Sequence, residues 1–472
     1  MATLPGFDAY IADGQLRIPP AISGPKVIIL GTCTNTAVPL LQPVKITDAY
    51  IGIAAVKHSS GEPSELSMAL EAVLLAGAQN VEVMKIANDS GELDAYTANS
   101  RWDALADAYE ALRAHPSDIV HPVGAYIDDS TPLSGTDPDG NSRTNFGKQL
   151  ADALYLMTKE GNTSIGVIGT MSINRAARKE SWSGAPSGLS GEYFSTPTRT
   201  HVTEWVYHLT GSTGGDDHSA EELTSEGYLA GSTETAPGTL SGSYDFWARG
   251  ASGSVAVDQY GGNVDGGMFL SVVAGLVKIG GAQTQALANM YASQSIYRID
   301  NGAASYAGFL TTLDPQIGAT NKTVPGLVPV REFNRTQAQS VLDKRFVTFL
   351  TRPRGYVVLK GITGAYNASN YTRSDFVMTT TTRITLACQD LVTQSAEPYI
   401  GEPMNMPNMN AMEASIDSGL RGFMKEGALR RYDFHIVATP DMMILGEAAV
   451  ILTIVPAFEL TNVTIQIALA RV

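Results

Sequence analysis

The sequence predicts an α/β protein with a mostly parallel sheet, followed by a smaller α+β domain, with extended segments at both ends. Three observations lead to this prediction. Short apolar runs of the buried-strand type alternate with helical segments through the first part of the chain. Beyond about Arg331 the pattern changes to short strands around amphipathic helices. The last residues alternate between apolar and small or polar side chains, the period of a strand with one apolar face.

The first α/β unit follows a stretch that lacks helical and core signals. Residues 1–22 contain Pro5 and two further prolines, and they predict an extended N-terminal arm. The apolar run Val27–Leu30 predicts a buried strand. A helix is expected over residues 65–76, with a proline near its start and a glycine after its end. A second apolar strand is expected over residues 81–86.

The alternation of helices and strands then continues. Residues 101–113 predict a helix with one apolar face, and residues 118–127 predict a strand. A further helix is expected over residues 145–158. The segment TSIGVIGT, residues 163–170, repeats the apolar run and Gly-Thr ending of VIILGT. Strands that are apolar on both faces indicate a parallel sheet with helices on both sides.

The middle of the chain differs in composition. Residues 181–254 are rich in Ser, Gly and Thr, and they predict a surface insertion with one helix at about Arg199–Leu209. Residues 264–279 are apolar again and predict a second helical segment.

The C-terminal part predicts a compact α+β domain. Two helices are expected, one beginning at about Thr381 and one over Met409–Lys425, whose apolar residues recur at helical spacing. The expected strands are Phe346–Leu350, Tyr356–Leu359, Phe376–Met378, Tyr432–Ala438, Glu447–Val455 and Thr461–Leu469.

Composition excludes several classes of protein. The chain has 472 residues and a net charge of −15, which does not suit wrapping of nucleic acid or binding to an anionic membrane surface. Its two cysteines, Cys33 and Cys388, lie far apart in apolar stretches and indicate buried thiols in a reducing compartment. We expect no signal peptide and no membrane span, because no apolar run reaches about 18 residues. The protein is expected to be made in the cytoplasm.

Motifs for catalysis are absent or incomplete. Gly31-Thr32 and Gly169-Thr170 follow strands as phosphate-binding turns do, but neither continues into a glycine-rich phosphate motif. No Gly-x-Ser-x-Gly elbow is present. The pairs His115 and His121, and His201 and His208, lack further ligands at zinc-type spacing. We therefore expect no catalytic residues and no cofactor.

Two acidic clusters are candidates for metal binding. Asp137, Asp139 and Asn141 match the first ligands of a calcium loop, but the glycine is misplaced and the final glutamate is missing. A Pro-Asp-Gly turn explains this cluster more simply. The cluster at 216–218 reads as a solvated loop tip. We expect no metal site at either position.

The final strand raises the question of its partner. Val463, Ile465, Ile467 and Leu469 form one apolar face. Chain ends usually fray unless they pair with something. The strand either completes the sheet of its own domain or adds to a sheet of another copy.

Several segments together resemble contractile tail sheath proteins of bacteriophages and related contractile injection machines. The segment from Gly355 to Asn405 is similar to the family's strand–turn–strand, with Arg383 at the start of the following helix. EGALRRYDFHI and VILTIVPAFELTNVTIQIAL are similar to its final strands. LPGFDAYI and GPKVIILGT are similar to its N-terminal arm and first strand. The turn after the strand departs from the family's pattern, since it reads Gly-Ile-Thr at 361–363.

The resemblance implies the following organisation. An N-terminal arm (1–22) precedes a subtilisin-like α/β sheath domain (23–339), whose surface insertion spans about 181–254. An α+β C-terminal domain (340–458) and a C-terminal arm strand (459–472) follow. It implies that the arms contact neighbouring copies through these residues: Pro5, Gly6, Phe7, Phe458, Val463, Ile465, Ile467 and Leu469.

The resemblance also implies a function and a set of partners. The chain would be a non-enzymatic subunit of a contractile sheath, forming stacked hexameric rings around an inner tail tube. Contraction of the sheath would drive the tube through the host envelope. Its partners would be other copies, the tube, the baseplate and the tail terminator, with the virion as its location. Two alternatives remain open: a nucleotide-dependent enzyme on an α/β scaffold, and another structural protein of a virion.

Overall fold

A computed structural model describes most of the chain between residues 25 and 461. The described residues are 25–61, 64–88, 98–128, 146–171, 191–197, 202–209, 217–219, 266–274, 276–279, 298–329, 338, 342, 345–353, 355–365 and 375–461.

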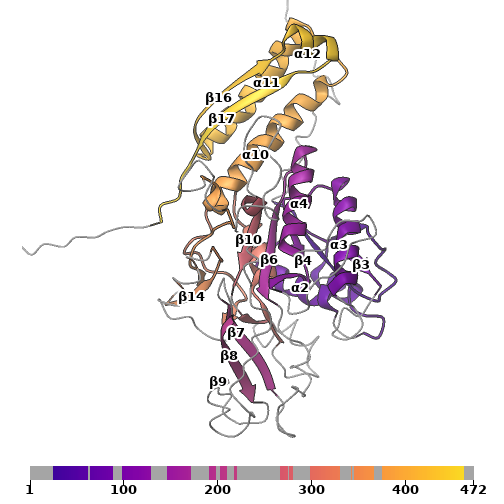
Figure 1. Ribbon diagram of the computed structural model, residues 1–472, viewed down its shortest axis with the longest axis vertical. Coiled ribbons are helices and arrows are strands. Elements are labelled where there is room, and N and C mark those ends of the chain that lie inside the picture. Colours follow the sequence, from indigo (N-terminus) through magenta and orange to yellow (C-terminus); the bar gives the residue numbers. More distant parts are fainter. Residues whose placement is uncertain are drawn as a thin grey trace, which may run out of the picture.

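A seven-stranded sheet forms the centre of the body (Figure 1). β1 (Val27–Thr32) lies between β3 (Val81–Ala87) and β4 (Ile119–Pro122), and all three are parallel. The sheet continues from β4 to β6 (Ile165–Met171) and β10 (Leu270–Val273), again in parallel. The mostly parallel sheet predicted from the apolar runs is thus confirmed.

Two shorter strands complete this sheet. β2 (Pro43–Ile46) pairs with β3 in antiparallel orientation and forms one edge. β5 (Tyr126–Asp128) runs parallel to β6. Neither was predicted as a separate strand, because each is too short for a clear periodicity.

Helices cover both faces of the sheet, as a doubly wound topology requires. α2 (Glu65–Leu75) and α8 (Ala303–Leu310) pack on the face that carries Val27 and Ile29. α3 (Ala98–Arg113) and α4 (Phe146–Lys159) pack on the face that carries Ile28 and Leu30. The alternating side chains of β1 therefore enter two separate cores. A short helix, α1 (Ala49–Ala55), lies against α2.

Smaller sheets surround the main one. β7 (Gly191–Pro197), β8 (Val202–Leu209) and β9 (Asp217–Ser219) form an antiparallel sheet at the end of the body opposite the C-terminal lobe (Figure 1). The other elements here are η2 (Gly266–Phe269), β11 (Leu276–Ile279), β12 (Arg298–Asn301), β13 (Val328–Pro329), β14 (Phe349–Arg352), β15 (Gly355–Val358) and η3 (Asp375–Val377).

Residues 379–456 form a C-terminal lobe that projects from the body (Figure 1). Its elements are α10 (Thr379–Ala396), η4 (Glu397–Tyr399), α11 (Met406–Lys425), β16 (Leu429–Val437), α12 (Pro440–Leu445) and β17 (Ala449–Pro456). β16 and β17 form an antiparallel pair whose apolar side chains pack on α10 and α11. Both predicted helices and two of the three predicted final strands are present, and the strand predicted at 461–469 lies almost wholly outside the described residues.

Four predictions for individual elements were wrong. The loop tip expected at 216–218 is in part the strand β9, which contains Asp217 and His218 and pairs with β8. The helix expected at Arg199–Leu209 is the strand β8, in which Val, Thr, Trp and Tyr, all residues favoured in strands, outweigh the helical spacing. The helix expected at 264–279 is η2 followed by the two strands β10 and β11. Its apolar run is a pair of buried strands, which periodicity alone does not separate from a helix. The strand expected at 376–378 is mostly the short helix η3.

Candidate assembly surface of the C-terminal lobe

The β16–β17 sheet has two open edges within the described part of the chain. β16 pairs with β17 from Leu429 opposite Pro456 to Val437 opposite Ala449, and no other described strand joins either of them. An open edge presents a row of backbone N–H and C=O groups that can pair with an added strand. The lobe is therefore a ready acceptor for an extended segment.

The inner face of this sheet is apolar, so the apolar side chains of an added strand could be buried on this face. Tyr432 and Phe434 of β16, and Leu452 and Ile454 of β17, pack on the helices beneath. β17 lies against α10 and β16 against α11. A strand added next to β17 would lie on the α10 side of the lobe, and α10 carries partly buried apolar side chains such as Val392 and Ala396.

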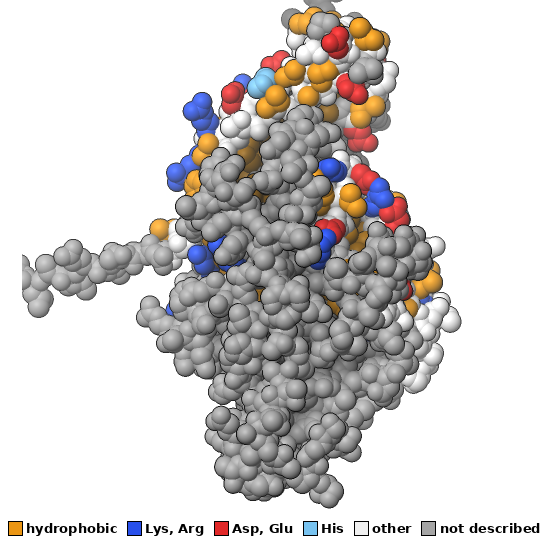
Figure 2. Space-filling view, in the orientation of Figure 1, with side chains coloured by type: hydrophobic (Ala, Val, Ile, Leu, Met, Phe, Trp, Pro, Cys, Tyr) orange, Lys and Arg blue, Asp and Glu red, His pale blue; other side chains and the backbone are white. Residues whose placement is uncertain are grey.

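The outer face of the sheet is apolar on one strand and polar on the other. On β17, Ile451 and Val455 are 48% and 37% exposed. The residues opposite them on β16 are His435 and Arg431, which are also exposed. Figure 2 shows hydrophobic and acidic side chains interspersed over the lobe. The apolar stripe therefore follows β17, next to one of the open edges.

The chain leaves the sheet along a short described segment after β17. The N–H group of Ala457 donates a hydrogen bond to the carbonyl of Ala428, 2.9 Å away. Phe458 and Leu460 point outward and are 63% and 81% exposed. Phe458 is the one predicted contact residue that the structure describes. The others lie outside the described residues: Pro5, Gly6, Phe7, Val463, Ile465, Ile467 and Leu469.

Arg383 joins the lobe to the body. It lies in the first part of α10, and its guanidinium donates to the carbonyl oxygens of Leu310 and Leu313, at 3.1 and 2.6 Å, where α8 ends. A cation at the C-terminal end of a helix satisfies carbonyl groups that lack partners within the helix. Burial lowers the pKa of Arg383 to about 10, so the side chain remains charged at neutral pH. The arginine singled out by the family resemblance thus has a structural role in this chain.

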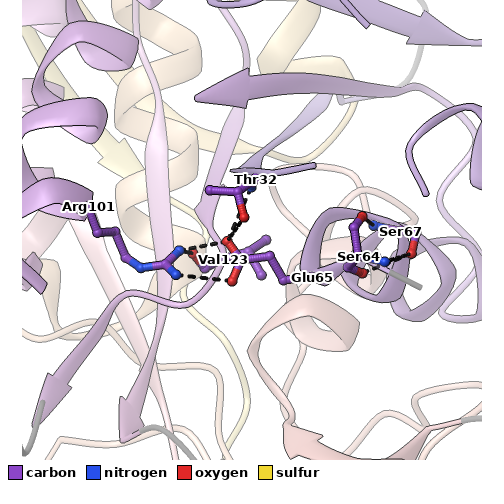
Figure 3. Close-up of polar contacts among 6 residues, drawn as sticks. All are labelled: Thr32, Ser64, Glu65, Ser67, Arg101 and Val123. Atoms are coloured by element: carbon purple, nitrogen blue, oxygen red, sulfur yellow. Dashed lines mark hydrogen bonds and ion pairs between the residues drawn. The ribbon is translucent and has the colours of Figure 1, made fainter. Parts of the chain in front are cut away.

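A buried ion pair occupies the place where doubly wound proteins usually bind ligands. The switch point of the sheet lies between β1 and β4, at their carboxyl ends. There Arg101 donates to both carboxylate oxygens of Glu65, at 2.6 and 3.2 Å, and to the carbonyl of Val123 (Figure 3). The same carboxylate accepts from the N–H and hydroxyl groups of Thr32.

This arrangement argues against phosphate binding at one of the two phosphate-like turns, Gly31-Thr32. Figure 3 shows Glu65 pointing at Thr32, directly after Gly31. A bound phosphate at this turn would meet a buried carboxylate, and the nearby cation is already committed to that carboxylate. The first turn of α2 is fixed by a reciprocal pair of bonds between Ser64 and Ser67, which holds Glu65 in place. No local pattern in the sequence indicates this pair, since its members are 36 positions apart.

Three further candidates, His121 and the two cysteines, have ordinary structural roles. His121 is buried, and its Nδ1 lies 2.8 Å from the carbonyl oxygen of Val167. Cys33 and Cys388 are buried free thiols, as predicted, and burial raises the pKa of Cys388 to about 12. Residues 137–141 and His201 lie outside the described residues. Within the described ranges, no three His, Cys, Asp or Glu side chains gather as a metal site.

No helix in the described part of the chain is long and apolar enough to cross a membrane.

The fold is that of contractile sheath subunits. No protein-family model matches the sequence, and no curated protein is significantly similar to it. The helical sheath of the anti-feeding prophage in its contracted state aligns with a TM-score of 0.55 at 11% identity, over 99% of both chains. The contracted sheath complex of an extracellular contractile injection system, PVC, gives 0.54 at 11% identity over 99% and 98%. A sheath tail protein from Listeria innocua gives 0.50 at 9% identity over 92% and 95%.

Proposed function

We propose that this chain is the structural subunit of a contractile sheath. The observation that carries the proposal is the similarity of nearly the whole chain, body and lobe together, to two contracted sheath subunits. A shared scaffold alone would leave function open. The open β16–β17 sheet and the ion pair at the switch point add independent support, because the first suits assembly and the second fills the place where a doubly wound enzyme usually binds its substrate.

In this proposal the body is a subtilisin-like α/β domain without a protease triad, and it corresponds to residues 23–339 with the insertion at about 181–254. The lobe belongs to an α+β domain (340–458), and residues 1–22 and 459–472 are arms. Copies form stacked hexameric rings around an inner tail tube, between a baseplate and a terminator. Contraction then drives the tube through the host envelope as part of a virion or a related particle.

The C-terminal arm would add as a strand to the lobe of a neighbouring copy. Its apolar face, from Val463 to Leu469, would continue the inner face of the β16–β17 sheet over α10. Association costs about 4–15 kcal/mol in lost freedom, so one added strand does not hold a dimer strongly. Several such contacts per subunit, at the high effective concentration of a lattice, hold the copies together strongly. This favours a polymer over a free dimer.

Removing residues 462–472 tests the proposal. We expect the purified full chain to form tubes with six-fold rings in negative-stain images. The shortened chain should fold, with unchanged circular dichroism and thermal midpoint, but form no tubes. A shortened chain that still assembles into normal tubes would contradict the role of the arm.

A matched pair of variants tests whether assembly needs the apolar face of the arm and not merely the presence of the arm. The double substitution Ile465→Asp and Ile467→Asp puts two carboxylates on the apolar face and should abolish tubes, because burying an unpaired charge is costly. The control, Thr464→Asp with Gln466→Asp, adds the same charge to the opposite face and should leave tubes largely intact. Equal effects of the two variants would argue against strand addition with a buried apolar face.

A further inference from the structure

Glu459, the first residue of the C-terminal arm, is held by hydroxyl groups from two separate elements. Thr320, in the loop that follows α8, donates its hydroxyl to Oε2 of Glu459 at 2.8 Å. Thr380, in the first turn of α10, donates to Oε1. Both residues on either side of Glu459 are exposed, whereas Glu459 is half-buried. At the start of the arm, the side chain of Glu459 therefore points toward the protein interior while its neighbours point to solvent.

The surroundings of this carboxylate are shaped to hold it. A methyl group on Gly318 would lie 2.2 Å from Cδ and from Oε1 of Glu459, so only glycine leaves room there. The N–H group of Gly361 donates to the hydroxyl oxygen of Thr320 at 3.0 Å, which orients this hydroxyl toward the carboxylate. Thr380 belongs to a helix N-terminus, which favours negative charge.

Charge and burial act in opposite directions on Glu459. Burial raises the pKa of its carboxyl group, while the hydrogen bond from Thr320 and the positive charges of Lys360 and Lys322 partly offset this effect. A carboxylate is not placed in such surroundings without hydrogen bonds to offset the loss of water. Both of its oxygens have a hydroxyl donor, so the site is complete.

Building on the proposed function, we propose that Glu459 anchors the start of the C-terminal arm to the body and so fixes the direction in which the arm leaves the molecule. Its partners lie on the loop after α8 and at the start of α10, which is the part of that helix buried in the body. The start of the arm is therefore fixed at the junction between the α/β body and α10, and not at the outer end of the lobe. In a lattice, this determines which neighbouring sheet the arm reaches.

A spin label at the start of the arm tests the anchor in the free subunit. Leu460→Cys places the label at an exposed position next to Glu459, and the two native thiols are fully buried. In the labelled parent the nitroxide should be motionally restricted. Glu459→Ala should mobilise it, because hydrogen bonds to a charged group shift the balance between held and released states by about 10- to 100-fold.

Gly318→Ala provides an independent perturbation that keeps Glu459 itself. The added methyl group meets only the end of a flexible side chain, so the fold should survive while the carboxylate is displaced. The control is Glu413→Gln, which removes one negative charge from an exposed position on α11. We expect Gly318→Ala to mobilise the label as Glu459→Ala does, and Glu413→Gln to leave it restricted.

Tube formation by the unlabelled variants completes the test. Glu459→Ala and Gly318→Ala should reduce the yield of tubes at least tenfold without changing the thermal midpoint. A label that stays restricted in both variants would overturn the anchor, as would mobile labels combined with normal tubes. Failure of the proposed function is recognised separately, because then the parent forms no tubes, or the chain lacking 462–472 forms them normally, whatever the label shows.

Discussion

Arg101 and Glu65 illustrate how much a single buried contact determines in the body. They come from α3 and α2, on opposite faces of the sheet, and meet at the carboxyl end of β1. Their side chains are 7% and 1% exposed. The pair thus ties the two helical layers together across the end of the sheet.

Substitution Arg101→Met should destabilise the body strongly. It leaves the carboxylate of Glu65 buried without its cation, which costs about 3–5 kcal/mol. Equilibrium unfolding in urea, followed by circular dichroism, measures the loss. The control is Arg113→Met, also on α3, whose ion pairs with Glu110 and Glu160 are exposed to solvent. An Arg101→Met variant as stable as the Arg113→Met variant would show that the buried pair contributes little.

Residues of this kind are not predictable from one sequence. Glu65 reads as an ordinary acid in the first turn of a helix, and Glu459 as the end of a Pro-Ala-Phe-Glu segment. Their roles depend on partners that are 36 and 139 positions away in the chain. Only Arg383 was singled out beforehand, through a family resemblance and without knowledge of its contacts.

At the scale of elements, α2 and α8 approach each other closely in the body. A methyl group on Gly308 of α8 would lie 2.5 Å from the carbonyl oxygen of Val73 and 2.8 Å from its Cα. These are backbone atoms of α2, which cannot rotate away. The two helices can therefore lie side by side on the sheet only because residue 308 has no side chain.

Gly308→Ala should force these helices apart. We expect a net loss of stability of about 1–3 kcal/mol from overpacking. The matched control is Gly422→Ala on α11, where no heavy atom lies within 4 Å of the added methyl group. That change should instead stabilise the protein by about 0.5–1 kcal/mol, since alanine is the better helix former. Thermal unfolding of both variants provides the measurement, and shifts of the same sign would refute the argument.

The elements that sequence predicted well are those whose pattern is long and local. α2, α3, α4 and α11 show helical spacing over three or more turns, and β1, β3 and β6 are rich in apolar residues. The predictions failed at β8, β10 and η3, which are short or depend on pairing with distant strands. The same reason explains why β2, β5 and α8 were not foreseen. The candidate assembly surface was located through the final strands and the family resemblance, while its open edges required the fold.

At the scale of the whole molecule, α10 is the element that connects lobe and body. Its early residues, including Arg383, are buried in the body, and Cys388 belongs to the core of the lobe. Midway, the amide of Gln389 donates to the carbonyl of Thr158 at the end of α4, 2.7 Å away. Because this continuous helix contacts both parts, it holds the lobe in a constant position relative to the body. This favours movement of body and lobe as one unit, with the arms as the adjustable connections between copies.

The net charge of −15 makes assembly of the whole molecule depend on salt concentration. Copies with this charge repel one another when they are packed into rings, and the repulsion acts over about 30 Å at 0.01 M salt but only about 10 Å at 0.1 M. Contacts made by backbone hydrogen bonds and apolar side chains depend far less on salt. We therefore expect tube formation, followed by light scattering, to become faster and more complete as NaCl rises from 0.01 to about 0.15 M. Assembly that weakens over this range would show instead that complementary charged patches between copies outweigh their overall repulsion.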